Sequence, residues 1–328
     1  MIRIYFTKYL LVTALWALCL CPSIGISQSF DFVPKNVFMS SYELTISTIS
    51  SVFKSGTEKE SLLEKILFQN RIPENEIDGS LRYDETRHLI KLQYGLLHNI
   101  NVGISVPYIN LQRNSDLSIN NSIYSSIATD LSSTETSDMG DLEIWGLWRV
   151  LYNDDIDLRF GLILDGDNAP YYFDQPDKLS LGNGTQDISF FLDLLLYANR
   201  NKLSSNFYLS QTSFLSKNVT DSNQEEQTIA RGYGLLGTFD TTYIIDNMTI
   251  GGGVLIESQG ETTVSGVGQR DAQFSYSFRL YFRLGNLNLL ENTSVELPWE
   301  CQVRLQDVFR GNNADQQTEL GLKISLYF

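Results

Sequence analysis

The sequence predicts an all-β fold, a closed antiparallel transmembrane β-barrel of about twelve strands. Apolar and polar residues alternate along most of the chain, in segments of roughly 10 residues, the length that a tilted strand needs to cross a bilayer. Long polar connections and short turns alternate between these segments, as in barrels with long extracellular loops and short periplasmic turns. Aromatic residues lie near the ends of the apolar faces, where a membrane interface is expected.

The N-terminal segment Met1–Ser27 has the pattern of a cleaved secretory signal. Arg3 and Lys8 precede a short apolar core, Tyr9–Cys21, and small residues follow where a signal peptidase would cut. The alternative is a membrane-anchoring helix, but the core is shorter than the ~20 apolar residues that such a helix needs. We therefore expect export and one barrel domain over residues 28–328, because no repeat or helical region interrupts the series.

The composition argues against several classes of function. The chain carries 24 cations and 39 anions, a formal charge of −15, which becomes −17 when Arg3 and Lys8 leave with the signal. Such an acidic chain lacks the basic footprint of nucleic-acid binding. Cys301 is the only cysteine outside the signal, so an intramolecular disulfide and a multiple-cysteine metal site are excluded in the mature chain. No later segment has the ~18 consecutive apolar residues of a membrane-spanning helix.

The clearest predicted hairpin runs from Thr86 to Tyr108. One face carries the apolar residues Ile90, Leu92, Tyr94, Leu96, Ile100, Val102, Ile104, Val106 and Tyr108. Lys91, Gln93 and Gly95 begin the opposite, polar face, because successive side chains of a strand point to opposite sides. The His98-Asn99 pair between the two runs is short enough for a tight turn.

The remaining strands follow the same alternation. In chain order we expect them at Tyr42–Lys54, Leu142–Leu151, Ile156–Leu164, Ile188–Tyr197, Leu203–Phe214, Ile229–Ile244, Met248–Glu257, Ala272–Leu284, Val295–Leu305 and Glu319–Phe328. Pro298 suggests a bulge in the strand that contains it. Long loops are expected at Gly56–Asp84, with a short helix around Glu60–Phe68, and at Arg113–Asp138, Gly166–Gly184, Ser216–Thr228, Ser258–Asp271 and Gln306–Gln317.

The charged faces are the candidate functional site. If apolar faces meet lipid, the lumen should be lined by Lys91, Glu143, Arg149, Asp157, Arg159, Asp193, Arg279, Arg283, Glu300 and Arg304. A soluble barrel with these charges outside is the alternative, and the aromatic positions favour the membrane. Inside a barrel, such charges form either a salt-bridge network that fills and stiffens a narrow lumen or a constriction that selects permeants by charge.

The sequence offers no catalytic, metal or cofactor site. Outside the signal it has only His88 and His98, and no serine two positions after His88 supplies the nucleophile that acyl transfer would require. Two histidines and one cysteine provide no zinc cluster. Asp165–Asn168 resembles only a fragment of a calcium loop, and Gly251–Gly253 lies within a strand with no helix after it. We expect a protein that is not an enzyme.

The final segment, Glu319–Phe328, places Leu320, Leu322, Ile324, Leu326 and Phe328 on one face. It resembles the closing strand of bacterial outer-membrane barrels, whose C-terminal aromatic residue is recognised by the barrel-assembly machinery. The resemblance implies that Tyr327 and Phe328 form an assembly signal. It also implies that the partners are this machinery and outer-membrane lipids, and that the protein lies in the outer membrane of a Gram-negative bacterium.

Three further motifs occur in order: Tyr94-Gly95-Leu96 through Val106-Pro107-Tyr108, then Gly140-Asp141-Leu142, then Leu181 through Asp187. Together they resemble the outer-membrane family named after the MetA pathway of phenol degradation and related barrels of unknown function. This chain departs from that family in its long Arg113–Asp138 loop. The resemblance implies passive transport of small molecules, apolar ones among the candidates. The alternative is a structural or surface-interaction barrel with a closed lumen.

Overall fold

The computed structural model describes residues 32–69, 72–73, 76–125, 129, 131–169, 179, 181, 185–198, 202–220, 226–264, 267–270, 272–286 and 298–328. The expected signal at 1–27 and the start of the domain at residue 28 lie outside these residues. In the described part of the chain, no helix is long and apolar enough to cross a membrane.

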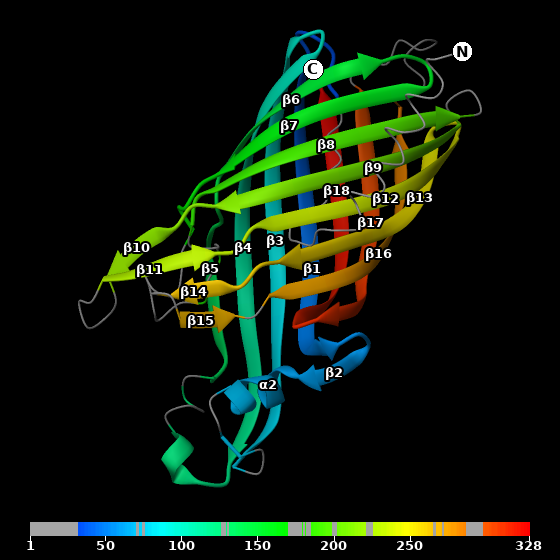
Figure 1. The fold of residues 1–328 in the computed structure, drawn as a ribbon. Helices are drawn as coiled ribbons and strands as arrows, with labels where there is room; N and C mark the ends of the chain where they lie inside the picture. Colours follow the sequence, from blue (N-terminus) through cyan, green and yellow to red (C-terminus); the bar gives the residue numbers. More distant parts are fainter. Residues whose placement is uncertain are drawn as a thin grey trace, which may run out of the picture.

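Twelve long antiparallel strands of the described chain form a closed barrel (Figure 1). It closes where β18 pairs with β1, from Met39 opposite Tyr327 to Phe53 opposite Ala314. The strands are β1 (Phe38–Ser55), β3 (Ile77–Leu97), β4 (Ile100–Ile119), β6 (Glu143–Tyr152), β7 (Ile156–Asp165), β8 (Asp187–Ala198), β9 (Leu203–Phe214), β12 (Gly234–Ile245), β13 (Met248–Gln259), β16 (Gln273–Gly285), β17 (Trp299–Asn312) and β18 (Ala314–Tyr327). The predicted fold class is confirmed.

The short turns lie at one end of the barrel, the periplasmic end. The start of β1 and the end of β18 lie at the same end. Phe38 and Phe328 exchange backbone hydrogen bonds of 3.1 and 2.8 Å there, which ties β1 to the C-terminus. The predicted His98-Asn99 turn joins β3 to β4, and Asp246-Asn247 joins β12 to β13 with Asp246 at a φ of 52°. Asp and Asn are suited to such tight turns because they tolerate positive φ.

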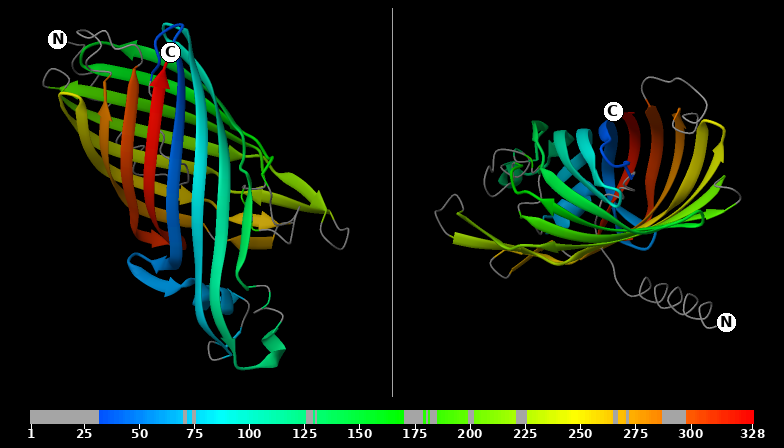
Figure 2. Two further views of the ribbon diagram at one scale, coloured as in Figure 1. Left: turned by 180° about the vertical axis from the view of Figure 1, so that it is seen from behind. Right: turned by 90° about the horizontal axis from the view of Figure 1, so that it is seen from above.

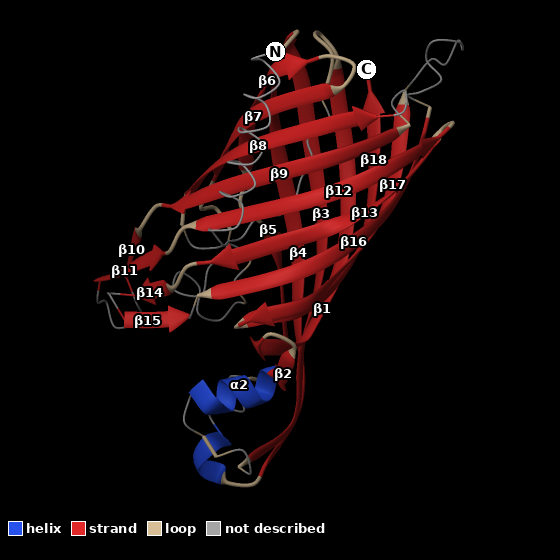
Figure 3. Cartoon of the chain, turned by 45° about the vertical axis from the view of Figure 1, so that its right-hand side comes forward, coloured by secondary structure: helices blue, strands red, loops and turns tan. Residues whose placement is uncertain are grey.

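The other, extracellular end carries additional secondary structure. A second sheet of β10 (Lys217–Thr220), β11 (Glu226–Arg231), β14 (Thr262–Val264) and β15 (Val267–Arg270) projects beyond the barrel wall (Figure 2). β2 (Glu58–Ser61), α2 (Leu62–Gln69), η1 (Ser122–Tyr124) and β5 (Thr134–Met139) accompany the extended β3–β4 hairpin. The helices lie past the barrel end in Figure 3.

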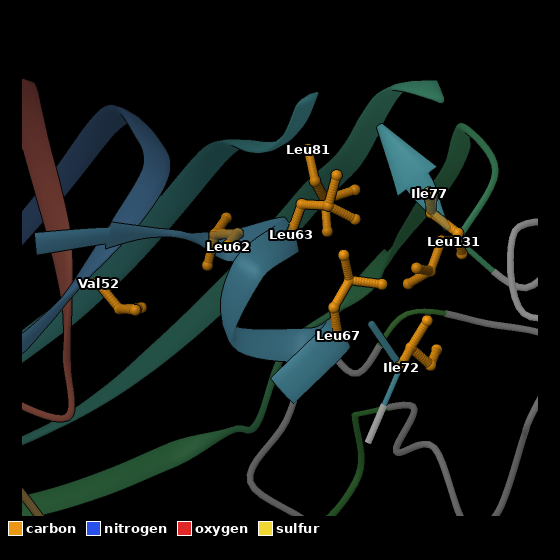
Figure 4. Packing of buried hydrophobic residues seen from close by; sticks show 8 residues of the cluster. All are labelled: Val52, Leu62, Leu63, Leu67, Ile72, Ile77, Leu81 and Leu131. Carbon is orange, nitrogen blue, oxygen red and sulfur yellow. The ribbon is translucent and has the colours of Figure 1, made fainter. Parts of the chain in front are cut away.

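The helix α2 begins with a capping box. Ser61 N donates to Glu64 Oε2 at 2.7 Å, and Glu64 N donates to Ser61 Oγ at 3.0 Å, so the first turn has its donors satisfied. The helix packs against the β3–β4 hairpin through a buried cluster of Val52, Leu62, Leu63, Leu67, Ile72, Ile77, Leu81 and Leu131 (Figure 4). This cluster is a small hydrophobic core outside the barrel, and it explains why the hairpin continues past the membrane.

Apolar side chains point outward and charged side chains inward. Ile90 is 48% exposed and Leu280 is 54% exposed, whereas Lys91 and Arg279, their neighbours in the chain, are 9% and 6% exposed. The same outward face presents Tyr42, Ile46, Val102, Ile144, Leu162, Phe239, Val254, Phe282, Val303 and Leu322. Exposing such a continuous apolar band to water would be unfavourable, so these side chains contact lipid, as predicted.

Several predicted boundaries were wrong. Gln306–Gln317 is not a loop: β17 and β18 run through it to a tight turn at Asn313, whose φ is 53°. Arg113–Asp138 is only partly a loop, because β4 continues to Ile119 and β5 begins at Thr134. Pro298 precedes β17 and forms no bulge within it. The loops predicted at 216–228 and 258–271 contribute strands to the second sheet, because distant loops pair with each other there.

Candidate functional site

The lumen holds the candidate site, and one of its ion-pair groups lies near the periplasmic turns. Asp157 is fully buried and accepts hydrogen bonds from Arg149 Nε (3.0 Å) and Nη2 (2.9 Å) and from Arg159 Nε (3.0 Å). Arg159 Nη2 also contacts this carboxylate, and Arg159 Nη1 lies 3.3 Å from Asp193 Oδ2. Asn206 Nδ2 donates to Asp193 Oδ1 at 3.0 Å. The structure therefore brings four of the predicted lumen residues into one network across β6, β7 and β8.

A second group of ion pairs lies across the lumen wall formed by β12, β13, β16, β17, β18 and β1. Arg283 Nη1 lies 3.2 Å from Glu300 Oε2, and Arg283 Nη2 donates to Gln302 at 3.4 Å. Arg304 Nη2 lies between Glu43 and Glu319, at 3.2 and 3.5 Å. The carboxylates Glu43 and Glu319 were not among the predicted lumen residues, although both fall on the inward phase of their strands.

Arg279 pairs with Asp240 across an intervening strand. In the strand register Asp240 lies opposite Gly253, and Gly253 lies opposite Arg279. Arg279 Nε donates to Asp240 Oδ1 at 2.6 Å, and Nη2 contacts the other carboxylate oxygen. A Cβ at position 253 would collide with Asp240 and with the Phe239 carbonyl, so only glycine leaves room for this contact. Large inward side chains lie over a cross-strand glycine in four further pairs: Trp145 over Gly103, Phe191 over Gly161, Tyr281 over Gly251 and Arg304 over Gly321.

Among the cavities between these side chains, two share Glu43 and Arg304. The inner chamber, nearer the periplasmic end, has a volume of about 70 Å³ and is lined by the cations Lys91, Arg279, Arg283, Arg304 and Lys323. Its lining carboxylates are Glu43 and Asp240. The outer chamber has about 230 Å³ and is lined by Glu43, Glu85, Glu257 and Glu319 with Arg87 and Arg304. The lumen therefore changes from acidic to basic toward the periplasm.

Part of the lumen is filled by an apolar cluster. Trp145, Leu147, Phe191, Tyr208, Leu236 and Leu255 are buried against one another, with Phe32 and Ile163 at the edge. Sequence reasoning missed this cluster because β6, EIWGLWRVLY, carries apolar residues on both faces.

Glu143, a predicted lumen residue, lies between Ser105 of β4 and Asp165 of β7 in the register and belongs to neither ion-pair group described above.

The segment before β1 enters the lumen. Val33 N donates to Asn101 Oδ1 at 2.7 Å, and Asn101 Nδ2 donates to the Val33 carbonyl at 2.9 Å. Gln93 Nε2 donates to the same Asn101 oxygen at 2.8 Å, and both side chains are buried. The Arg149 guanidinium lies 3.7 Å from the centre of the Phe32 ring, a cation–π contact. The N-terminal segment thus occupies part of the lumen beside the Arg149–Asp157–Arg159 network.

The other singled-out residues lie outside the lumen or at its ends. Tyr42 and His88 form a 2.7 Å hydrogen bond on the outward face, beside Tyr108. Tyr327 is buried and Phe328 is exposed at the periplasmic end. Their role as an assembly signal stays a prediction. In the described residues no group of three or more His, Cys, Asp and Glu side chains is arranged to hold a metal ion.

Comparison with known proteins gives structural matches alone. No protein-family model matches the chain. No curated protein matches it either. The COG4313 outer membrane channel from Pseudomonas putida F1 superposes with a TM-score of 0.68 at 15% identity, over 93% of this chain and 100% of the channel. A Pseudomonas aeruginosa FadL homologue (12% identity, 90% of each chain) and the Ralstonia pickettii toluene transporter TbuX (8%, 90% of each chain) reach only 0.37 and 0.39. At these identities the similarity to the COG4313 channel shows the fold alone, a closed outer-membrane β-barrel.

Proposed function

We propose that the protein is a passive channel for small molecules in the outer membrane of a Gram-negative bacterium. The observation that carries this proposal is the pair of adjoining chambers in the lumen, which share Glu43 and Arg304 and are lined by charged side chains. A barrel that served only as a scaffold would have no need of cavities along its axis. Export by a cleaved signal and insertion by the barrel-assembly machinery belong to the same proposal.

Charge selection is the mechanism that the lining supports. A solute crossing the lumen leaves bulk water and passes side chains whose fields act over short distances in a confined space. The inner chamber holds five cations against two carboxylates, so it favours anions, and Arg304 stands where the two chambers meet. Apolar cargo, which the family resemblance implies, would have to pass the same charged chambers.

Planar-bilayer recordings and a liposome-swelling assay test the channel. The wild-type barrel should conduct, and the basic inner chamber should raise the permeability of anions relative to that of cations. Arg283→Gln should lower the anion preference, because it removes a chamber cation and leaves Glu300 without that partner. The double variant Asp240→Asn/Arg279→Gln removes a neutral pair and should change selectivity less. Lys202→Gln, at an exposed periplasmic position, is the control. Unchanged selectivity in Arg283→Gln would contradict charge selection in this chamber.

A structural barrel with a closed lumen is the second candidate. It is favoured by the apolar cluster and by Phe32 and Val33, which together occupy part of the lumen. Wild-type vesicles that stay impermeable to small solutes would favour this candidate. Asn101→Ala then tests whether residues 32–34 close the lumen, because it removes both hydrogen bonds to Val33, and conductance should appear if they do.

A further inference from the structure

The inner chamber carries an excess of positive charge. Its lining has five cationic side chains and two carboxylates, which leaves a surplus of three positive charges. Glu300 and Glu319 contact two of the arginines and offset part of this positive charge. Lys91 and Arg279 are more than nine-tenths buried, so these charges are shielded from bulk water. Shielding strengthens the attraction of such a site for an anion.

Hydrogen-bond donors also face the chamber. Arg304 lines it, and the Nε of this guanidinium is buried without a hydrogen-bond partner among the described residues. Gly321 lies opposite Arg304 in the register, and the Arg304 guanidinium lies over this glycine. Tyr281 also lines the chamber. Guanidinium groups suit carboxylate and phosphate oxygens because they present several N–H donors in one plane.

The lining of the outer chamber, which is otherwise polar and acidic, includes three apolar side chains. Leu89, Leu255 and Val308 line the outer chamber and are buried. About 70 Å³ in the inner chamber has room for a head group, whereas the larger outer chamber, of about 230 Å³, has room for the body of a small molecule. A molecule with an oxyanion at one end and a small apolar body at the other would fit both volumes.

We infer that the inner chamber is a binding site for the oxyanion head group of a small organic acid, with the apolar body of the ligand in the outer chamber. This inference rests on the proposed function, since the ligand would occupy the path of permeation. A phosphate group shares the head-group chemistry, so the test includes inorganic phosphate. A carboxylate is the preferred head group because an organic acid also supplies an apolar body for Leu89, Leu255 and Val308, which inorganic phosphate lacks.

Equilibrium binding to the purified full-length barrel in detergent tests the site without measuring transport. Isothermal titration calorimetry with benzoate should show one saturable site, which weakens as ionic strength rises. Benzyl alcohol, which has the same body without the charge, should show none. Acetate, which lacks the apolar body, should bind more weakly than benzoate. Tighter binding of inorganic phosphate than of benzoate would overturn the assignment to organic acids.

Variants of the chamber cations give the second measurement. Lys323→Gln removes one chamber cation and should raise the Kd of benzoate about tenfold or more, the usual effect of losing one charged hydrogen bond. Lys91→Gln should act in the same direction, and Lys323→Gln decides the question if the more buried Lys91 variant does not fold. The control, Lys202→Gln, should bind benzoate like the wild type.

The result separates the site from the proposed function. Absence of saturable benzoate binding to the wild type, or an unchanged Kd in Lys323→Gln, would refute the site even if the barrel conducts ions. Saturable, Lys323-dependent binding to a barrel that does not conduct would support the site and refute the channel.

Discussion

An alanine at position 253 should destabilise the barrel although it adds one methyl group. Gly253 lies on the inward face of β13, between Asp240 of β12 and Arg279 of β16 in the register. The new Cβ would lie well under 3.0 Å from the Phe239 carbonyl oxygen and from Asp240 Oδ1. Neither neighbour is the end of a long flexible side chain, so the strand pair or the carboxylate must move.

The magnitude follows from two effects. Forcing a methyl group into a packed site costs about 1–3 kcal/mol. Displacing the Asp240 carboxylate also weakens its contacts with Arg279, and both residues are buried. Complete loss of a partner from a buried ion pair costs about 3–5 kcal/mol, and the pair is here displaced and not deleted. We therefore expect Gly253→Ala to lower the free energy of unfolding by about 2–4 kcal/mol.

Urea unfolding of the barrel in lipid vesicles, followed by tryptophan fluorescence, measures this change. Gly146→Ala is the matched control, because a Cβ on this strand glycine would have nothing within 4 Å. Its free energy of unfolding should stay within about 1 kcal/mol of the wild type or rise, since alanine restricts the unfolded chain. Equal unfolding midpoints for Gly253→Ala and Gly146→Ala would refute the argument that glycine is needed for the Asp240–Arg279 contact.

Three further variants test other parts of the molecule. Asp157→Asn should cost about 3–5 kcal/mol in the same unfolding assay, because it leaves two arginines sharing a neutral amide. A loss of stability no larger than that caused by Asp155→Asn, at an exposed position, would contradict this expectation. Leu67→Ala, at a side chain 2% exposed, should cost the hydrophobic cluster around α2 about 2–5 kcal/mol and speed proteolysis of α2 and its neighbours. Phe68→Ala, at a side chain 82% exposed, should have little effect. Phe328→Ala should reduce the amount of heat-modifiable, folded barrel in outer-membrane fractions, and undiminished assembly would remove Phe328 from the proposed signal.

Local alternation, together with the loop lengths and the aromatic positions, predicted the barrel. The period of two in β3, β4 and β16 separated an apolar face from a charged face, and this pattern depends on side-chain direction alone. Short turns such as His98-Asn99 could be placed because their residues tolerate tight bends. The prediction failed where polar sequence forms strands, as in Gln306–Gln317, because strands outside the membrane need no apolar face.

The sequence by itself determined that a charged face and an apolar face are separated along most strands, whereas the tertiary structure decided which charged side chains meet in the lumen. Arg279 reaches Asp240 across Gly253, and Arg304 reaches Glu43 and Glu319 beside Gly321, and these contacts depend on strand register. A register is set by pairing between whole strands, so alternation within one strand carries no information about it. The apolar lumen cluster, the inward course of Phe32 and Val33, and the two chambers were decided in the same way. They arise only when twelve strands close and bring distant faces together.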